Sequence, residues 1–141
     1  MKVLSLAYIM YVRSILESGS VVFSPWKAKD KVALERIQNM FTKRIFMRSK
    51  LLKFNETPNA IQRNRELKLD LLEVRRKRAD MKFMRKMLDG KCGLNSNDFY
   101  KFKRTRTRGS LYKISIPRSR LKSRKFSFAC RTSLQYSQIY G

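Results

Sequence analysis

The acidic residues of this 141-residue chain all lie at or before Asp98, and this asymmetry limits what the chain can fold into more than any other feature. Residues 1–98 carry 22 Lys and Arg side chains, and residues 99–141 carry 12 with no carboxylate among them. The formal net charge is +24, so a compact form must withstand strong self-repulsion unless a polyanion is nearby. This balance favours RNA or DNA as the partner. An anionic membrane surface and a plain solvated surface are the alternatives.

The composition also excludes most kinds of catalytic site. The chain has no histidine, and Cys92 and Cys130 stand alone, which excludes the usual zinc knuckle and any catalysis that needs a His base. A two-metal polymerase or nuclease needs carboxylates that converge on the ions, but the aspartates are scattered singly along the chain. No Gly-rich phosphate loop is present. We therefore expect no independent enzyme, no cofactor, no metal and no small-molecule substrate.

The most apolar stretch, residues 3–12, is too short to cross a bilayer, which takes about 20 residues, so membrane insertion is not expected. It has the length of a signal-peptide core, and a small secreted basic protein is therefore one hypothesis. Arg13 and Glu17 instead continue a helical pattern over residues 3–18, and Gly19 is typical of a helix C-terminus. The helix is the favoured interpretation, and with it an intracellular location in the nucleus or cytoplasm.

A second helix is predicted over residues 29–47, because Leu34, Ile37, Phe41 and Ile45 recur on one face. We expect Ile15 and Leu16 of the first helix to be buried against this face. The opposite face is basic, and it is either a phosphate-contacting surface or an ordinary solvated one.

Two more helices are predicted before the composition changes. The first starts with Thr57 as N-cap and Pro58 in the first turn, and it ends near Leu67. The second runs over residues 68–89 and ends at Gly90, with Leu72, Ala79, Phe83 and Met87 on one face. Arg76 falls within that apolar face, so its head must reach solvent or pair with a carboxylate such as Asp80.

Residues 91–123 have no helical period, and they mix Lys and Arg with aromatic residues. Such a mixture suits single-stranded nucleic acid, where cations follow phosphates and rings stack on bases, or it is a poorly ordered linker. The alternation in "SLYKISI" indicates a short strand. A last helix is expected in residues 124–141, with Phe128, Ala129, Leu134 and Ile139 as candidate docking residues, and with Arg131 free to face a phosphate or cap a carbonyl.

The overall prediction is a mainly α fold, a small assembly of four to five helices with a basic and largely irregular C-terminal third that contains a short strand or hairpin. The expected organisation is a helical region at residues 1–90, a basic arm at residues 91–123, and a C-terminal helix at residues 124–141.

Five segments in order resemble the C-terminal part of reverse transcriptases of non-LTR (LINE-like, jockey-type) retrotransposons. They are "YVRSILESGSVVFSPW", "LERIQNMFTKRIF", "LDLLEVRRKRADMKFMRKMLDG", "TRTRGSLYKI" and "PRSRLKSRKFSF". In that family they follow the polymerase palm and form the thumb and the region behind it. The resemblance implies contact with template RNA and the growing duplex, and a helical thumb-like region at residues 1–90.

The resemblance and the basic patterning together select the candidate nucleic-acid-binding residues. The thumb-like helix supplies three cations, and the arm and the segment behind it supply the rest: Arg36, Lys43, Arg44, Lys101, Lys103, Arg104, Arg106, Arg108, Arg118, Arg120, Lys122, Arg124 and Lys125.

The departures from the family point to a protein without polymerase activity. The Tyr-x-Asp-Asp motif of the palm has no counterpart, and Tyr136 to Tyr140 replace the Trp-Asn-x-Leu-Pro-like end of the family. We therefore expect a nonenzymatic remnant of a retroelement RNA-directed DNA polymerase, a truncated or domesticated copy that binds nucleic acid independently of sequence. The alternatives are an inert and unstable pseudogene product, whose apolar first helix is exposed, and the secreted protein described above.

Overall fold

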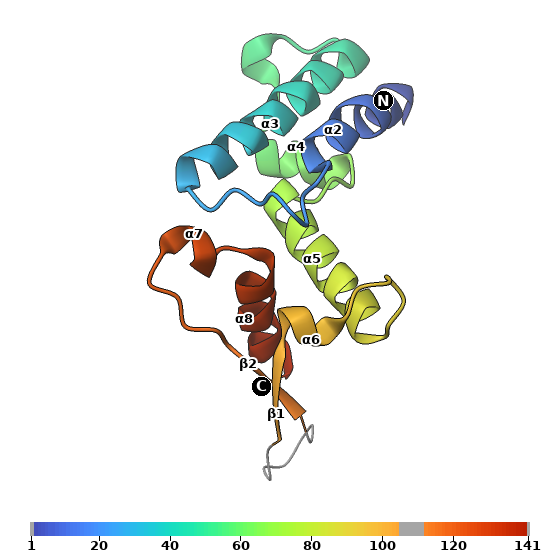
Figure 1. Ribbon diagram of the computed structural model, residues 1–141. Coiled ribbons are helices and arrows are strands. Elements are labelled where there is room, and N and C mark those ends of the chain that lie inside the picture. The colour runs from blue at the N-terminus through green and yellow to red at the C-terminus, as the bar shows by residue number, and fades with distance from the viewer. Residues whose placement is uncertain (1, 105–111, 141) are drawn as a thin grey trace. The chain divides into compact units, whose positions relative to one another are not determined.

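The computed structural model describes residues 2–104 and 112–140, and it is mainly helical with a small antiparallel hairpin in the C-terminal third, as the sequence predicted (Figure 1). The helices are α1 (Lys2–Ala7), the π-helix η1 (Tyr8–Arg13), α2 (Ser14–Glu17), α3 (Ala28–Lys50), the 3-10 turn η2 (Phe54–Glu56), α4 (Ala60–Glu66), α5 (Leu72–Leu88), α6 (Ser96–Phe99), α7 (Lys122–Lys125) and α8 (Phe128–Tyr140). The strands are β1 (Lys101–Arg104) and β2 (Tyr112–Ser115).

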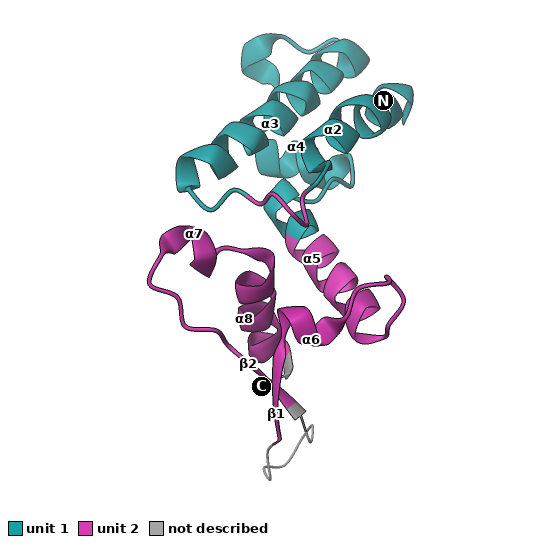
Figure 2. Ribbon diagram, in the orientation of Figure 1, with its two compact units in different colours: residues 1–19, 25–76 teal, residues 20–24, 77–141 magenta. Residues whose placement is uncertain are grey.

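The chain forms two compact units, each with its own core (Figure 2). Unit 1 comprises Met1–Gly19 and Pro25–Arg76, and unit 2 comprises Ser20–Ser24 and Lys77–Gly141. These boundaries differ from the three ranges expected from composition, because segments that follow residue 91 fold back onto the C-terminal half of α5.

The core of unit 1 is built around Tyr8, Ile45 and Leu69. The Tyr8 hydroxyl donates to Gln38 Oε1 at 2.9 Å, and Gln38 Nε2 donates to the Asp70 carbonyl at 3.1 Å. Burial raises the pKa of Tyr8 to about 12. Gln38 is completely buried, so this chain of hydrogen bonds satisfies polar groups that the core would otherwise leave unpaired.

The expected burial of Ile15 is wrong, since this side chain is 75% exposed and Leu16 is only half-buried. Leu4, Tyr8, Ile9 and Val12 pack on the core instead. The reason lies in η1, whose wider π-helical turn advances each residue by a smaller angle than an α-helix does. Residues after η1 are therefore shifted around the axis relative to an ideal 3.6-residue pattern. The end of the segment is as predicted, because Gly19 has a φ of +63°.

The predicted start of α4 is also wrong, because the N-cap is Asn59 and not Thr57. Asn59 Oδ1 accepts from the backbone N–H of Gln62 at 2.9 Å. Thr57 is occupied elsewhere, since its hydroxyl donates to the carbonyl of Phe54 at 2.9 Å and closes η2. The predicted end near Leu67 is confirmed.

The core of unit 2 is built around Met84, Met87 and Tyr100. The rings of Phe83 and Phe128 meet edge to face with their centroids 5.6 Å apart, which joins α5 to α8. The Tyr100 hydroxyl lies 2.8 Å from Thr132 Oγ1, and burial raises the pKa of Tyr100. Strand β2 packs against α8, so the hairpin is part of this unit.

The C-terminal segment differs from the single helix expected over residues 124–141. Helix α7 ends at Lys125, and α8 begins at Phe128. Phe128 and Ala129 pack on the core as expected, but Leu134 and Ile139 are 37% and 60% exposed. The buried positions of α8 are instead small and polar ones, among them Thr132 and Ser133, whose hydroxyls donate to carbonyls one turn back.

Candidate nucleic-acid interface

Several arginines of unit 1 are committed to internal bonds and are not available to a ligand. Arg63 is 6% exposed; its Nη2 donates to the Asn39 carbonyl at 3.2 Å and its Nη1 to the Pro58 carbonyl. Burial lowers the pKa of Arg63. Arg75 binds Glu17 through two N–H groups, with Nη2 and Oε2 3.0 Å apart, which raises the pKa of Arg75.

Arg76, the arginine inside the apolar face of α5, is 6% exposed. Its Nη2 donates to the Leu16 carbonyl at 2.7 Å. Neither expected arrangement is found: the head does not reach solvent, and among the described residues it binds this carbonyl and not a carboxylate such as Asp80. Its bond reaches a backbone group near the end of α2, where the last carbonyls of a helix lack partners within the helix.

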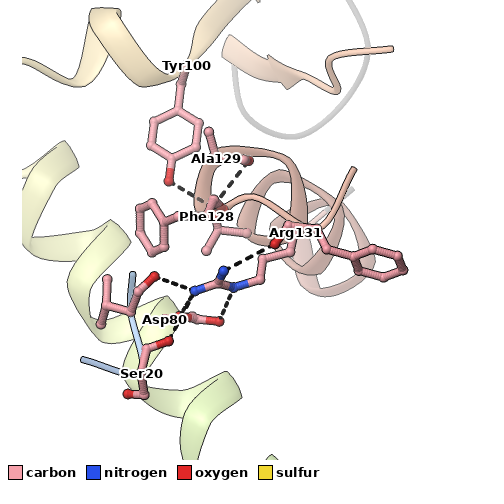
Figure 3. Close-up of polar contacts among 9 residues, drawn as sticks. Ser20, Asp80, Tyr100, Phe128, Ala129 and Arg131 are labelled. Atoms are coloured by element: carbon pink, nitrogen blue, oxygen red, sulfur yellow. Dashed lines mark hydrogen bonds and ion pairs between the residues drawn. The ribbon is translucent and has the colours of Figure 1, made fainter. Parts of the chain in front are cut away.

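Arg131 of α8 binds one carboxylate and several backbone carbonyls of unit 2 (Figure 3). Its Nε and Nη2 donate to the two oxygens of Asp80, both at 2.8 Å. It also donates to the carbonyls of Ser20, Val21 and Phe126. The Asp80 and Arg131 side chains are only 2% and 11% exposed. Of the two roles expected for Arg131, the structure shows carbonyl capping, and it adds a carboxylate 51 residues away.

The predicted cations lie elsewhere, and the first group is on α3. Arg36 and Arg44 are exposed, and Lys43 is half-buried with its Nζ over the Phe54 ring. At 3.6 residues per turn, Arg36 and Lys43 lie on one face about 10 Å apart along the axis, with Arg44 next to Lys43. Arg48 is exposed one turn beyond Arg44, and both lie toward the side of α3 that carries Phe41 and Ile45, since all four line one pocket; Arg48 was not selected from the sequence.

The second group is on the hairpin, and the strand register arranges it. Lys101, Lys103 and Arg104 are all exposed on β1. Lys103 stands directly opposite Lys113 of β2, while Phe102 pairs with Ile114. Because side chains alternate between the faces of a strand, Lys101, Lys103 and Lys113 share one face, and Ile114 packs toward the core on the other. Lys113 was missed, because only the register places it opposite Lys103.

The third group follows the hairpin. Arg118 and Arg120 are exposed in the connection, and α7 carries exposed Lys122, Arg124 and Lys125. On this one-turn helix Lys122 and Lys125, three residues apart, lie on the same side, and Arg124 lines a pocket. Arg106 and Arg108 lie outside the described residues.

The described members of these groups have one property in common. Within residues 2–104 and 112–140, no ion pair involves any of the predicted cations, although Lys31, Lys50, Lys91, Arg75 and Arg131 each pair with a carboxylate. These pairs take up the carboxylates of Glu17, Glu66, Glu73, Asp80 and Asp89, and each pair lies within one unit. The predicted cations remain as uncompensated positive charge in three groups.

The described part of the chain has no cluster of three or more His, Cys, Asp or Glu side chains able to hold a metal ion. In the same residues no helix is long and apolar enough to cross a membrane. Comparisons with protein-family models, with curated proteins and with solved structures found no match.

Proposed function

We propose that this protein binds the phosphate backbone of RNA or DNA without base selectivity and has no catalytic activity of its own. The observation that carries the proposal is the set of exposed cations on α3, the hairpin and α7, none of which has a carboxylate partner in the described chain. Phosphates would supply the missing counter-charge, and release of condensed counterions would drive binding.

The hairpin gives the proposal its most specific support. Like charges directly opposite each other on paired strands destabilise a hairpin. The Lys103–Lys113 pair is such an arrangement, and Lys101 adds a third charge to the same face. A polyanion lying along this face removes the repulsion. The positive charge on this face of the hairpin therefore favours the binding of a polyanion, which would neutralise it.

The lack of base selectivity follows from the position of the cations. Exposed Lys and Arg side chains on a helix or strand face meet phosphates first. Contacts of this kind position the protein on a nucleic acid but carry little sequence information.

We propose further that the chain derives from the thumb and post-polymerase region of a non-LTR retrotransposon reverse transcriptase. The proposal rests on the ordered resemblance of five segments, and the surface of unit 1 supports it. Val3, Leu6, Met10 and Ile15, on the helical segment at residues 2–17, are between 56% and 80% exposed. An apolar face of this kind suits a module that packs against further protein. The same face favours the alternative of an inert product that aggregates by itself.

The test is the salt dependence of binding. Fluorescence anisotropy with a labelled 20-nucleotide single-stranded RNA is measured between 50 and 200 mM KCl. We expect the logarithm of affinity to fall linearly with the logarithm of salt concentration, with a slope of about −0.7 for each phosphate contacted. The variant Lys103→Gln/Lys113→Gln should flatten the slope by about 1.4.

A matched control changes the same charge at lysines that already have partners. Lys31 pairs with Glu73, and Lys91 pairs with Asp89, so Lys31→Gln/Lys91→Gln should leave the slope nearly unchanged. Affinity that does not vary with salt, or equal losses in both double variants, would contradict the proposal. Absence of cooperative unfolding in the purified chain would favour the inert product.

A further inference from the structure

A pocket in unit 2 lies between the hairpin, α6 and the start of α8, and it has a volume of about 320 Å³. Its lining combines three kinds of group. Lys101 and Arg124 are cationic, Asn97 and Asp98 offer an amide and a carboxylate, and Phe99 and Pro117 provide apolar surface. Lys101 and Arg124 are both among the predicted nucleic-acid-binding residues, although they are 23 residues apart in the sequence.

We infer that this pocket accepts one unstacked nucleotide of a single strand. The inference rests on the proposed nucleic-acid binding and extends it, because it assigns a single-strand site to a particular place in the fold. Sites that bind single-stranded RNA combine cations for the phosphates, a ring for the base and polar groups for the base edge. The lining residues supply each of these.

The cations and the ring define how a nucleotide would lie. Lys101 is exposed on β1, and Arg124 is exposed on α7, with no ion pair to either within the described residues. Because both line the same pocket, a phosphate held there would lie near two positive charges. Phe99 lines the pocket and is 39% exposed, so a base that enters can stack on its ring.

The amide of Asn97 and the carboxylate of Asp98 would hydrogen-bond to the base edge and the sugar of the nucleotide, and not to its phosphate. Asp98 carries a carboxylate that only accepts hydrogen bonds, and it would repel a phosphate placed beside it. Its partners are N–H groups of a base edge, while the Asn97 amide can both donate and accept. The two cations outnumber the single carboxylate in the lining, so the pocket favours an anionic ligand.

The size of the pocket separates single strands from duplexes. Its volume is near the lower limit of small-molecule pockets, which range from about 300 to 1,000 Å³. A base that is paired and stacked in a duplex cannot enter it. The face formed by Lys101, Lys103 and Lys113, in contrast, can meet the phosphates of either form. Loss of the pocket should therefore weaken single-strand binding alone, and loss of charge on the hairpin should weaken both.

The experiment compares labelled 12-nucleotide single-stranded RNA with the corresponding 12-base-pair duplex, using anisotropy at one salt concentration. Phe99→Leu keeps an apolar side chain but removes the ring, and Phe99→Tyr keeps the ring. Stacking of one base on an aromatic ring contributes about 1–3 kcal/mol, so Phe99→Leu should lower single-strand affinity about fivefold or more and leave duplex affinity unchanged. Phe99→Tyr should retain both affinities. Thermal unfolding of each variant checks that the fold is intact.

The charge variant Lys103→Gln/Lys113→Gln serves as the comparison, because it should reduce both affinities by similar factors. Equal effects of Phe99→Leu on single strand and duplex, or no effect on either, would overturn the pocket inference while leaving the backbone-binding proposal in place. Failure of the unaltered protein to bind either RNA in a salt-dependent way would overturn the backbone-binding proposal itself.

Discussion

At the scale of single residues, the scarcity of carboxylates decides which cations are structural. The chain has 34 basic and 10 acidic side chains, so most cations cannot be paired internally. Asp80 is the most buried of the paired carboxylates, and Arg131 donates two N–H groups to its two oxygens. Arg131 also donates to the carbonyls of Ser20 and Val21. One arginine thus fastens the Ser20–Ser24 segment to α5 and α8.

We predict that Asp80→Ala lowers the free energy of unfolding by about 3–5 kcal/mol, because it leaves the Arg131 guanidinium buried without its counter-charge. Urea unfolding followed by circular dichroism measures the change. Asp89→Ala is the matched control: Asp89 is exposed and lies 3.4 Å from Lys91, so the loss there should stay within about 0.5 kcal/mol.

A double variant shows whether the cost comes from the unpaired charge. Asp80→Leu/Arg131→Met removes both charges and keeps side chains of similar size, so it should regain much of the stability that Asp80→Ala loses. If Asp80→Ala is no more destabilising than Asp89→Ala, the ion pair between Asp80 and Arg131 does not stabilise unit 2 as we propose.

At the scale of elements, the hairpin is the place where the stability of the free protein and the proposed binding make opposite demands. Lys103 and Lys113 face each other across the strands, and the three lysines of this face have no carboxylate partner among the described residues. A free hairpin would be better stabilised by opposite charges at this pair. An anion bound to this face would remove the repulsion.

We predict that Lys103→Glu stabilises unit 2 while it weakens RNA binding. A Glu opposite Lys113 replaces repulsion by attraction, which should increase the free energy of unfolding by about 0.2–1 kcal/mol. The same change removes one positive charge and adds a negative one, so affinity for single-stranded RNA at 100 mM KCl should fall. Urea unfolding and anisotropy on the same preparation measure both quantities. Lower stability together with unchanged affinity would show that this face does not contact phosphate.

The elements also show what the sequence could and could not predict. The position of α3 and the ends of α2 and α5 followed from hydrophobic periodicity and from Gly19 and Gly90, because these signals are local; α5 begins at Leu72, later than the predicted residue 68. The exposure of Ile15 could not be predicted, since it depends on where a π-helical turn replaces an α-helical one. The cap at Asn59 depends on a competing bond that Thr57 makes to Phe54.

For the candidate interface, the sequence could predict which cationic residues are candidates. It could not predict which of them lie close together in the fold. Lys113 joins the hairpin face only through the strand register, and Lys101 and Arg124 meet at one pocket only through the folding of unit 2. The pairing of Arg131 with Asp80 spans 51 residues, and no spacing rule connects residues so far apart.

At the scale of the whole molecule, the net charge of +24 acts on both compact units at once. Charges of one sign repel one another in any compact form, and salt weakens this repulsion because the Debye length falls from about 30 Å at 0.01 M to about 8 Å at 0.15 M. Internal ion pairs as buried as Asp80–Arg131 are screened much less. Added salt should therefore relieve repulsion at the surface more than it weakens the bonds that hold the units.

We predict that the unfolding temperature of the free protein rises when KCl is increased from 20 to 300 mM. The unfolding temperature of the protein bound to RNA should fall over the same range. In the complex, a ligand at 100 times its dissociation constant contributes about 2.7 kcal/mol, and salt removes this contribution by weakening phosphate contacts. Differential scanning calorimetry with and without a 20-nucleotide RNA measures both curves, which should converge at high salt. Lys101→Gln/Lys103→Gln/Lys113→Gln should show a smaller rise when free and a smaller difference when bound. A free protein whose unfolding temperature falls with salt would mean that its stability depends on exposed ion pairs and not on relief of self-repulsion.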